Sequence, residues 1–265
     1  MLAQPLDVHV DARGVVTVTL NRPEVNNAYD AAMLTRMHEA LDDLAELPGA
    51  RVLVLRGAGK HFQAGADLGW LQAVRAGNRA ENLEASRLTG SAVDRLNRVS
   101  VPVVCAVQGA CFGGGTGLPA ASDVVLAADS TVFSIAEVRW GLQASVIIPQ
   151  LNDAMSARQV RRYALTAERF DAHEARRIGL VHEVVPLADL DDRTEQVVGS
   201  LLQNGPEAVA RTKAHVRDHA WGGFDSETFE QLVSSHAQTR QGDEAGEGLR
   251  SFLDRRPAAW LPRAE

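Results

Sequence analysis

The sequence predicts an α/β protein in which buried strands alternate with amphipathic helices. Two apolar runs rich in β-branched residues, 51–56 and 101–107, have the length and composition of strands buried on both faces. Before both runs, apolar residues recur at helical spacing from Met33 to Leu44. Beyond residue 185 the pattern becomes almost wholly helical. We therefore predict a strand-and-helix core over 1–185 and a helical C-terminal subdomain over 186–265.

Composition limits the class of function. The 265 residues are 45% hydrophobic and 23% charged, which is typical of a folded globular chain. A formal net charge of -7 disfavours nucleic acid or an anionic membrane as the main partner, although a local basic phosphate pocket stays open. We expect no partner of either kind.

Cysteine usage and the N-terminal residues bear on the compartment. Cys105 and Cys111 lack metal-ligand spacing and are expected to be small buried hydrophobes, so no metal is expected. The first ten residues lack the pattern of a signal peptide, and no apolar run approaches membrane-spanning length. These features favour a soluble protein of a reducing compartment, most simply the cytoplasm.

The remaining elements follow from local signals. Alternating apolar residues on both sides of Gly14 predict a β-hairpin over 8–20. Asp30 is a suitable N-cap for the helix that carries Met33, and Asp67 for a second helix. Strands are further expected over 124–128 and 131–134, and helices over 81–98, 172–177, 187–202, 206–220, 225–240 and 243–255.

The stretch 101–123 is the most informative part of the chain. Its apolar strand leads into three consecutive glycines, Gly113 to Gly115, and then into residues that can begin a helix. Glycines let a ligand approach the backbone, and the unpaired N–H groups of a helix start favour an anion or a developing oxyanion. The same pattern is also typical of a tight strand-to-helix turn with no ligand.

A second loop of small residues leaves the strand at 51–56. Ala64, Gly65 and Ala66 permit close approach of a ligand to the backbone, and Asp67 and Leu68 follow at the start of the next predicted helix. Capping by Asp67 is expected whether or not a ligand binds.

Glu137 is the candidate acid–base residue. It stands among apolar neighbours in I-A-E-V-R-W-G-L, a setting that raises a carboxyl pKa and suits proton transfer. An isolated glutamate on a short amphipathic turn is, by itself, equally typical of a protein surface.

Taken together, the motifs resemble the crotonase superfamily (enoyl-CoA hydratase/isomerase) over nearly the whole chain. The segments that carry the resemblance are N-R-P-E-V-N-N-A at Asn21, H-F-Q-A-G-A-D-L at His61, Q-G-A-C-F-G-G-G at Gln108, A-E-V-R-W-G-L at Ala136, A-R-R-I-G-L-V-H-E-V-V at Ala175 and G-L-R-S-F-L-D-R-R-P-A-A-W at Gly248. The resemblance implies a spiral of ββα turns, packing as a trimer or a dimer of trimers, and a coenzyme A thioester as substrate without a separate cofactor.

The resemblance also assigns roles to residues. It implies that the N–H groups of Ala66 and Gly114 polarise the thioester carbonyl while Glu137 moves protons. Ala64, Gly65, Asp67, Leu68 and Gly113 would line the substrate site. Phe252 and Arg255 fall where relatives contact the adenine and the 3′-phosphate, often from a neighbouring subunit; for Arg255, a plain surface arginine is an equal alternative.

One departure limits the function that the resemblance implies. Hydratases of this family usually carry a second glutamate two residues after the glycine triplet, and this chain has Gly117 there. Our leading hypothesis is hydration of a short or branched 2-enoyl-CoA with one glutamate. The alternatives are a Δ3,Δ2-enoyl-CoA isomerase that uses the same groups, and a catalytically inactive CoA-binding or scaffold member.

Three local sequence motifs suggest a subgroup of this superfamily. E-V-R-W-G-L, R-R-Y-A-L-T-A-E-R-F-D-A and G-G-G-x-G-L look most like bacterial 3-methylglutaconyl-CoA and isohexenylglutaconyl-CoA hydratases. Such substrates carry an extra carboxylate that Arg139 would pair with, unless Arg139 makes a structural salt bridge instead. Gln143 departs from the proline common at that position in the subgroup.

Overall fold

A computed structural model describes residues 4–220 and 226–262 and shows an α/β fold built on two sheets. The larger sheet has the strand order β1-β2-β3-β4-β6-β9; β1 and β2 form the antiparallel hairpin, and the other neighbours are parallel. The smaller sheet has the order β5-β7-β8. The strands are β1 (Leu6–Val10), β2 (Val15–Leu20), β3 (Val52–Gly57), β4 (Val103–Val107), β5 (Ala110–Phe112), β6 (Val124–Ala128), β7 (Val132–Ser134), β8 (Phe170–Asp171) and β9 (Glu183–Val185).

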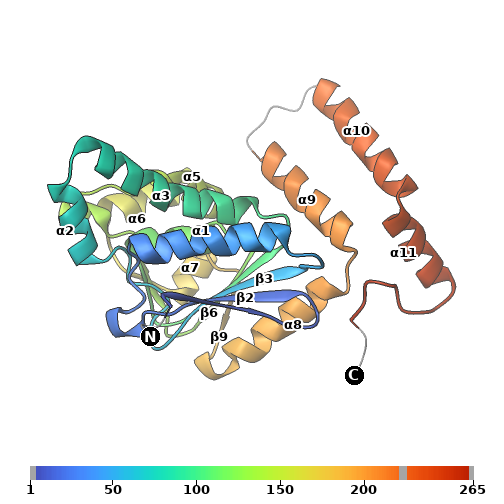
Figure 1. The fold of residues 1–265 in the computed structure, drawn as a ribbon, viewed down its shortest axis with the longest axis horizontal. Coiled ribbons are helices and arrows are strands. Elements are labelled where there is room, and N and C mark those ends of the chain that lie inside the picture. The colour runs from blue at the N-terminus through green and yellow to red at the C-terminus, as the bar shows by residue number, and fades with distance from the viewer. Residues whose placement is uncertain (1–3, 221–225, 263–265) are drawn as a thin grey trace.

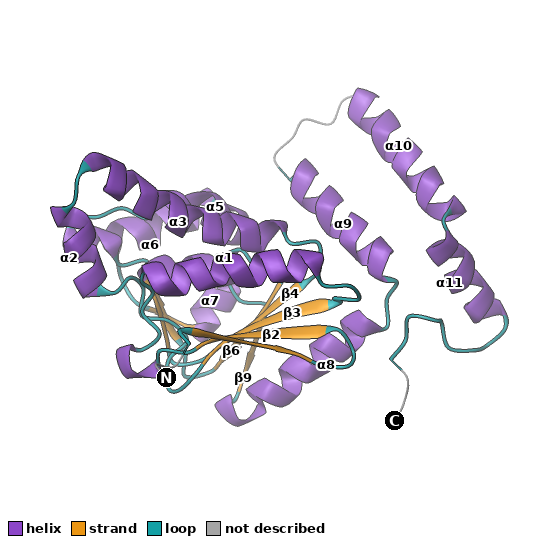
Figure 2. Ribbon diagram, in the orientation of Figure 1, coloured by secondary structure: helices purple, strands orange, loops and turns teal. Residues whose placement is uncertain are grey.

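Helices cover both faces of the larger sheet (Figures 1 and 2). The helices are α1 (Ala31–Glu46), α2 (Leu68–Ala76), α3 (Arg79–Arg98), α4 (Gly117–Ala120), α5 (Ile148–Met155), α6 (Ala157–Thr166), α7 (Ala172–Ile178), α8 (Leu190–Leu202), α9 (Pro206–His219), α10 (Ser226–Gln241) and α11 (Asp243–Leu253). The hairpin and the expected helices are thus confirmed, with shifts of a few residues at several ends.

The chain winds as a spiral in which successive turns supply one strand to each sheet. β4 is followed at once by β5, and β6 by β7; after β3, Gln63 makes a single bridge to Cys111 of β5 in the same manner. This is the ββα arrangement that the sequence resemblance implies.

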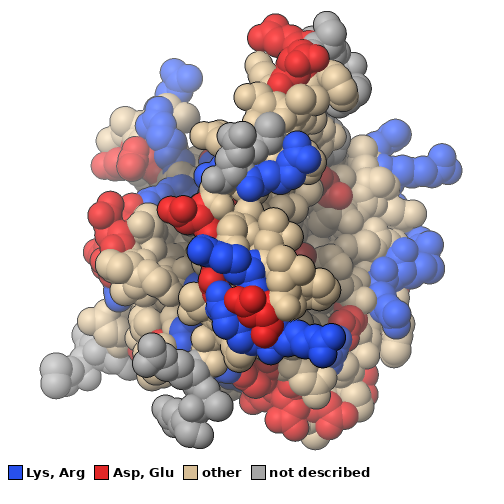
Figure 3. All heavy atoms as spheres, turned by 90° about the vertical axis from the view of Figure 1, so that its right-hand side faces the viewer, with Lys and Arg blue, Asp and Glu red and all other residues tan. Residues whose placement is uncertain are grey.

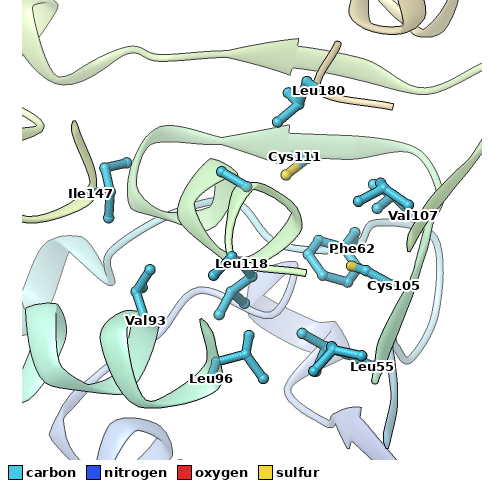
Figure 4. Close-up of a cluster of buried hydrophobic side chains, with 14 of the residues drawn as sticks. Leu55, Phe62, Val93, Leu96, Cys105, Val107, Cys111, Leu118, Ile147 and Leu180 are labelled. Carbon is cyan, nitrogen blue, oxygen red and sulfur yellow. The ribbon is translucent and has the colours of Figure 1, made fainter. Parts of the chain in front are cut away.

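The core explains why the central strands are continuous apolar runs in the sequence. In β3, Leu53 and Leu55 belong to the cluster that packs toward α1 and α3, whereas Val52 and Val54 belong to the cluster that includes Val198 of α8. Both faces of the strand are therefore removed from water, so alternation between apolar and polar residues disappears. The close-up in Figure 4 shows the first cluster, with α4 embedded in it.

The C-terminal helices fall into two groups. α8 packs on the sheet, whereas α9, α10 and α11 extend away from the rest of the molecule (Figure 1). The division of the chain at residue 185 stays a prediction. The structure adds that α8, which lies beyond this residue, completes the cover of the core.

The fold shows the surroundings of the two cysteines and of His182. Cys105 and Cys111 are free and buried, as small hydrophobes are. His182, although exposed, accepts a hydrogen bond at Nδ1 from the Val125 N–H (3.0 Å), which is a structural role. Among the described residues, no helix has the length and apolarity to cross a membrane, and no group of His, Cys, Asp and Glu is arranged to hold a metal ion.

Candidate active site

The loop after β3 presents backbone N–H groups that have no acceptor among the described residues. The Ala64 N–H donates to the Asn26 carbonyl (3.0 Å), and the Asp67 N–H donates to the Tyr29 carbonyl (2.8 Å). In the described part of the chain, no acceptor takes the N–H of Ala66, which lies between them. The loop thus leaves the Gly65 and Ala66 amides available between two residues whose own N–H groups are bonded.

The glycine loop lies directly against this first loop. The Phe112 N–H donates to the Gln63 carbonyl (2.9 Å), and a Cβ placed on Gly65 would come within 3.0 Å of the Phe112 carbonyl oxygen. Gly65 also has φ +90°, which a residue with a side chain rarely adopts. The small residues seen in the sequence are therefore needed for the two loops to meet.

Gly114 lies in the first turn of the 3-10 helix η2 (Gly113–Thr116), which continues into α4. N–H groups of a first helical turn have no acceptor within the helix, and the helix dipole places partial positive charge on them. The amides of Ala66 and Gly114 therefore belong to two loops in contact with each other.

The Glu137 carboxylate lies at the junction of these loops. Glu137 begins the 3-10 helix η3 (Glu137–Trp140), which follows β7, and its Oε1 lies 3.5 Å from the position of a Cβ on Gly113. Its Oε2 is buried without a hydrogen-bond partner among the described residues. Burial raises the pKa of Glu137, a shift only partly offset by a hydrogen bond from its own backbone. A fully solvated surface carboxylate is thereby ruled out.

Apolar side chains fill the space beside residue 117, where the side chain of a second glutamate would start. Gly117 is buried in α4, and a Cβ there would come within 2.6 Å of Ile147 Cγ2 and 3.3 Å of Val93 Cγ2. Figure 4 shows Val93 and Ile147 beside α4. The absence of the acid at 117 is thus matched by apolar packing around it.

The flanking residues of the first loop have separate tasks. Asp67 is the N-cap of α2, accepting from the Trp70 N–H (3.0 Å), and it also faces Arg22 (3.4 Å). The same Arg22 pairs with Asp30 (2.9 Å), the N-cap of α1. Leu68 begins α2 and is 64% exposed, so it offers an apolar side chain beside the loop.

Arg139 corrects one expectation. Its Nη2 donates to the Ala167 carbonyl (2.8 Å), and no ion pair is found for it among the described residues. The structural salt bridge weighed from the sequence is therefore wrong: the guanidinium holds a backbone carbonyl that Ser134 also contacts.

Phe252 and Arg255 do not join the other site residues within one chain. Phe252 is 82% exposed on α11, and Arg255 follows that helix. α2, which begins just after Ala66, and α11 lie at opposite ends of the molecule (Figure 1). Any contact of these two residues with such a site would have to come from another chain.

Sequence reasoning missed two residues at the site. The Tyr29 side chain packs against Gly114, and the Gln63 side chain, 3% exposed, packs against Gly115 with its Oε1 unpartnered. Together they border a cavity of about 20 Å³, the room of one water. Their positions depend on contacts with Ala66 and Cys111 far along the chain, which no local pattern signals.

The fold and site define a spiral α/β protein in which two glycine-containing loops meet beside the carboxylate of Glu137. The family model for enoyl-CoA hydratase/isomerase matches residues 11–263, and the chain belongs to this family. The expected superfamily is thus confirmed.

Named relatives of this chain include more than one reaction type. The chain is 32% identical over 248 residues to a hydroxycinnamoyl-CoA hydratase-lyase of Pseudomonas fluorescens, covering 91% of this chain and 89% of that one. It is 31% identical over 211 residues to a peroxisomal Δ(3,5)-Δ(2,4)-dienoyl-CoA isomerase of Arabidopsis thaliana, covering 76% of each. The crystal structure of an enoyl-CoA hydratase from Shewanella pealeana superposes with a TM-score of 0.93 at 32% identity, covering 97% and 96%.

Proposed function

We propose that the protein hydrates a short or branched 2-enoyl-CoA with Glu137 as its single acid–base residue. The observation that carries the proposal is the Glu137 carboxylate beside Gly113, where the Ala66 and Gly114 loops meet, with its Oε2 buried and without a partner among the described residues. No separate cofactor takes part, since coenzyme A belongs to the substrate.

The chemistry follows from these three groups. As water adds to the β-carbon, Glu137 takes its proton, and the π electrons move onto the thioester oxygen. The Ala66 and Gly114 amides stabilise the resulting enolate; losing one donor of this kind typically lowers the rate by about 10²–10³. Glu137 then returns the proton to the α-carbon, which completes the addition of water.

Coenzyme A is held partly across a subunit boundary in this proposal. Because α11 lies far from α2 within one chain, Phe252 and Arg255 are proposed to reach the site of a neighbouring chain. The working unit that we propose is a trimer or a dimer of trimers, as the sequence resemblance implies. A guanidinium is well suited to the 3′-phosphate. We retain a glutaconyl-type substrate and a cytoplasmic location as part of the same proposal.

The test is loss of conjugated-thioester absorbance when a panel of 2-enoyl-CoAs is incubated with the protein. We expect Glu137→Gln to lower the hydration rate by about 10²–10⁴, the usual contribution of acid–base catalysis, while the exposed control Glu46→Gln leaves it unchanged. Full activity of Glu137→Gln would refute the assignment. Tight CoA binding without turnover would favour the inactive alternative.

One observation favours the isomerase alternative. Ile147 and Val93 occupy the space beside Gly117, so a second carboxylate is excluded by packing as well as by sequence. An isomerase needs one carboxylate only, to carry a proton between two carbons. Conversion of a 3-enoyl-CoA to its 2-enoyl isomer, without hydration of the product, would select this function.

A further inference from the structure

Tyr29 connects both loops of the candidate site. Its N–H donates to the Gly65 carbonyl (2.8 Å), and its carbonyl accepts from the Asp67 N–H (2.8 Å). These two bonds hold the backbone on either side of Ala66. The orientation of the free Ala66 amide therefore depends on the backbone of Tyr29.

The Tyr29 side chain reaches the second loop. A Cβ on Gly114 would overlap the Tyr29 hydroxyl and come within 3.0 and 3.1 Å of two ring carbons. The ring also meets Trp70 edge to face, with 5.9 Å between centroids. These contacts fix the ring, so the hydroxyl has a defined position against the Gly114 backbone.

The hydroxyl itself has no hydrogen-bond partner among the described residues, although its ring is well packed. Burial and the nearby Glu137 carboxylate together raise the pKa of Tyr29, so the hydroxyl stays protonated at neutral pH. It is a neutral group that can donate and accept a hydrogen bond near Glu137.

We propose that the Tyr29 hydroxyl hydrogen-bonds the water that adds to the substrate, so that Tyr29 and Glu137 hold it together. This inference rests on the proposed hydration. Ordinarily two carboxylates would grip the water, but Gly117 and the packing of Ile147 exclude the second. Tyr29 exchanges no proton in the net reaction: Glu137 takes a proton from the water and delivers it to the α-carbon.

The proposed role of Tyr29 should affect only one of two reactions that the same site can be tested for. Hydration of a 2-enoyl-CoA needs a held water, whereas exchange of an α-proton of butyryl-CoA with D₂O needs only Glu137 and the two amides. Tyr29→Phe removes the hydroxyl and keeps the ring and the backbone bonds. We expect it to lower the hydration rate about 10- to 100-fold, the effect of one lost hydrogen bond, and to leave the exchange rate within about 2-fold.

Tyr163→Phe is the matched control, because the Tyr163 hydroxyl bonds Glu174 away from the loops. It should leave the ratio of hydration to exchange unchanged. Equal hydration rates for wild type and Tyr29→Phe would overturn the role of Tyr29 alone. A parallel fall in both reactions would mean a purely structural tyrosine, and would also overturn it. A wild-type protein that exchanges but does not hydrate would refute the proposed function, and this role with it.

Discussion

At the scale of single residues, the surroundings of Glu137 lower the stability of the protein and make the carboxylate more suitable for proton transfer. A buried carboxylate oxygen without a partner costs free energy, because the charged form loses water and gains no hydrogen bond in return. The same burial raises its pKa, which brings a carboxyl group closer to the neutral range in which it can both take and give a proton.

Replacing Glu137 by glutamine should therefore stabilise the protein at neutral pH while it lowers the hydration rate. We expect a gain of about 1–3 kcal/mol in the free energy of unfolding, measured by denaturation of Glu137→Gln, Glu46→Gln and wild type. Because the pKa is raised on folding, the native state binds this proton more tightly than the unfolded chain does. The penalty is absent below the ordinary pKa, grows as the pH rises past it, and is complete above the raised pKa. The advantage of glutamine should shrink as the pH falls toward 4.5. An advantage that grows on acidification would contradict this origin.

A second residue-scale prediction concerns the filled space at Gly117. Gly117→Ala gains helix propensity of about 0.5–1 kcal/mol, but its Cβ would meet Ile147 Cγ2 at 2.6 Å. Overpacking costs about 1–3 kcal/mol, so we expect net destabilisation in a thermal melt.

Ile147→Ala removes the obstructing methyl group and serves as the partner in a double-mutant cycle. Ile147→Ala alone should lower the free energy of unfolding by about 2–5 kcal/mol. The double variant should lose less stability than the sum of the losses in the two single variants. Strict additivity would show that Ile147 does not limit the room at residue 117.

At the scale of elements, two helix N-termini hold the Ala66 loop. Arg22 joins Asp30 and Asp67, the N-caps of α1 and α2, and Tyr29 bridges to Ala66 between them. The amide proposed to bind the thioester oxygen is thus placed by the starts of two helices and not by its own side chain.

Removing one cap should disturb both stability and rate. Asp67→Ala loses the hydrogen bond from the Trp70 N–H and the pairing with Arg22, and we expect about 1 kcal/mol lower stability with a reduced hydration rate. Asp67→Asn keeps an oxygen for the cap and serves as control. Thermal melts and hydration rates of both variants test this; an equal loss of stability in both would assign the effect to the ion pair.

The elements also show what sequence reasoning reaches and where it stops. The helices and the buried strands follow from hydrophobic spacing, which is local information. β5 has three residues and β8 has two, so they carry no period of their own and form only because neighbouring turns of the spiral align them with β7, which the sequence does predict. Likewise, the sequence shows that position 117 carries glycine in place of the second acid, but it does not show that the Ile147 side chain fills the neighbouring space.

At the scale of the whole molecule, α9–α11 form an arm that leaves apolar side chains uncovered. The arm is attached to the body by polar contacts: Lys213 pairs with Asp123 (2.7 Å), and Arg51 donates to the Trp260 carbonyl (2.7 Å). On the side of the molecule that bears the arm, charged side chains of both signs alternate with uncharged surface (Figure 3). Among the described residues of the arm, large apolar side chains are exposed at Val216, Val233, Leu249, Phe252 and Leu253.

An uncovered apolar surface of this kind is expected to pack against other copies of the chain, as the proposed contact of Phe252 with a neighbouring CoA requires. Val233→Glu on α10 should weaken that packing, because a charge buried between subunits without a partner is costly. Ser234→Glu places the same charge one residue further on, at an exposed polar position, and should leave assembly intact. The mass in solution, measured by light scattering over a range of concentrations, should be a multiple of three chains for wild type and Ser234→Glu and should fall for Val233→Glu. A wild-type protein that stays monomeric would remove the means by which α11 could reach the site, and with it the assigned roles of Phe252 and Arg255.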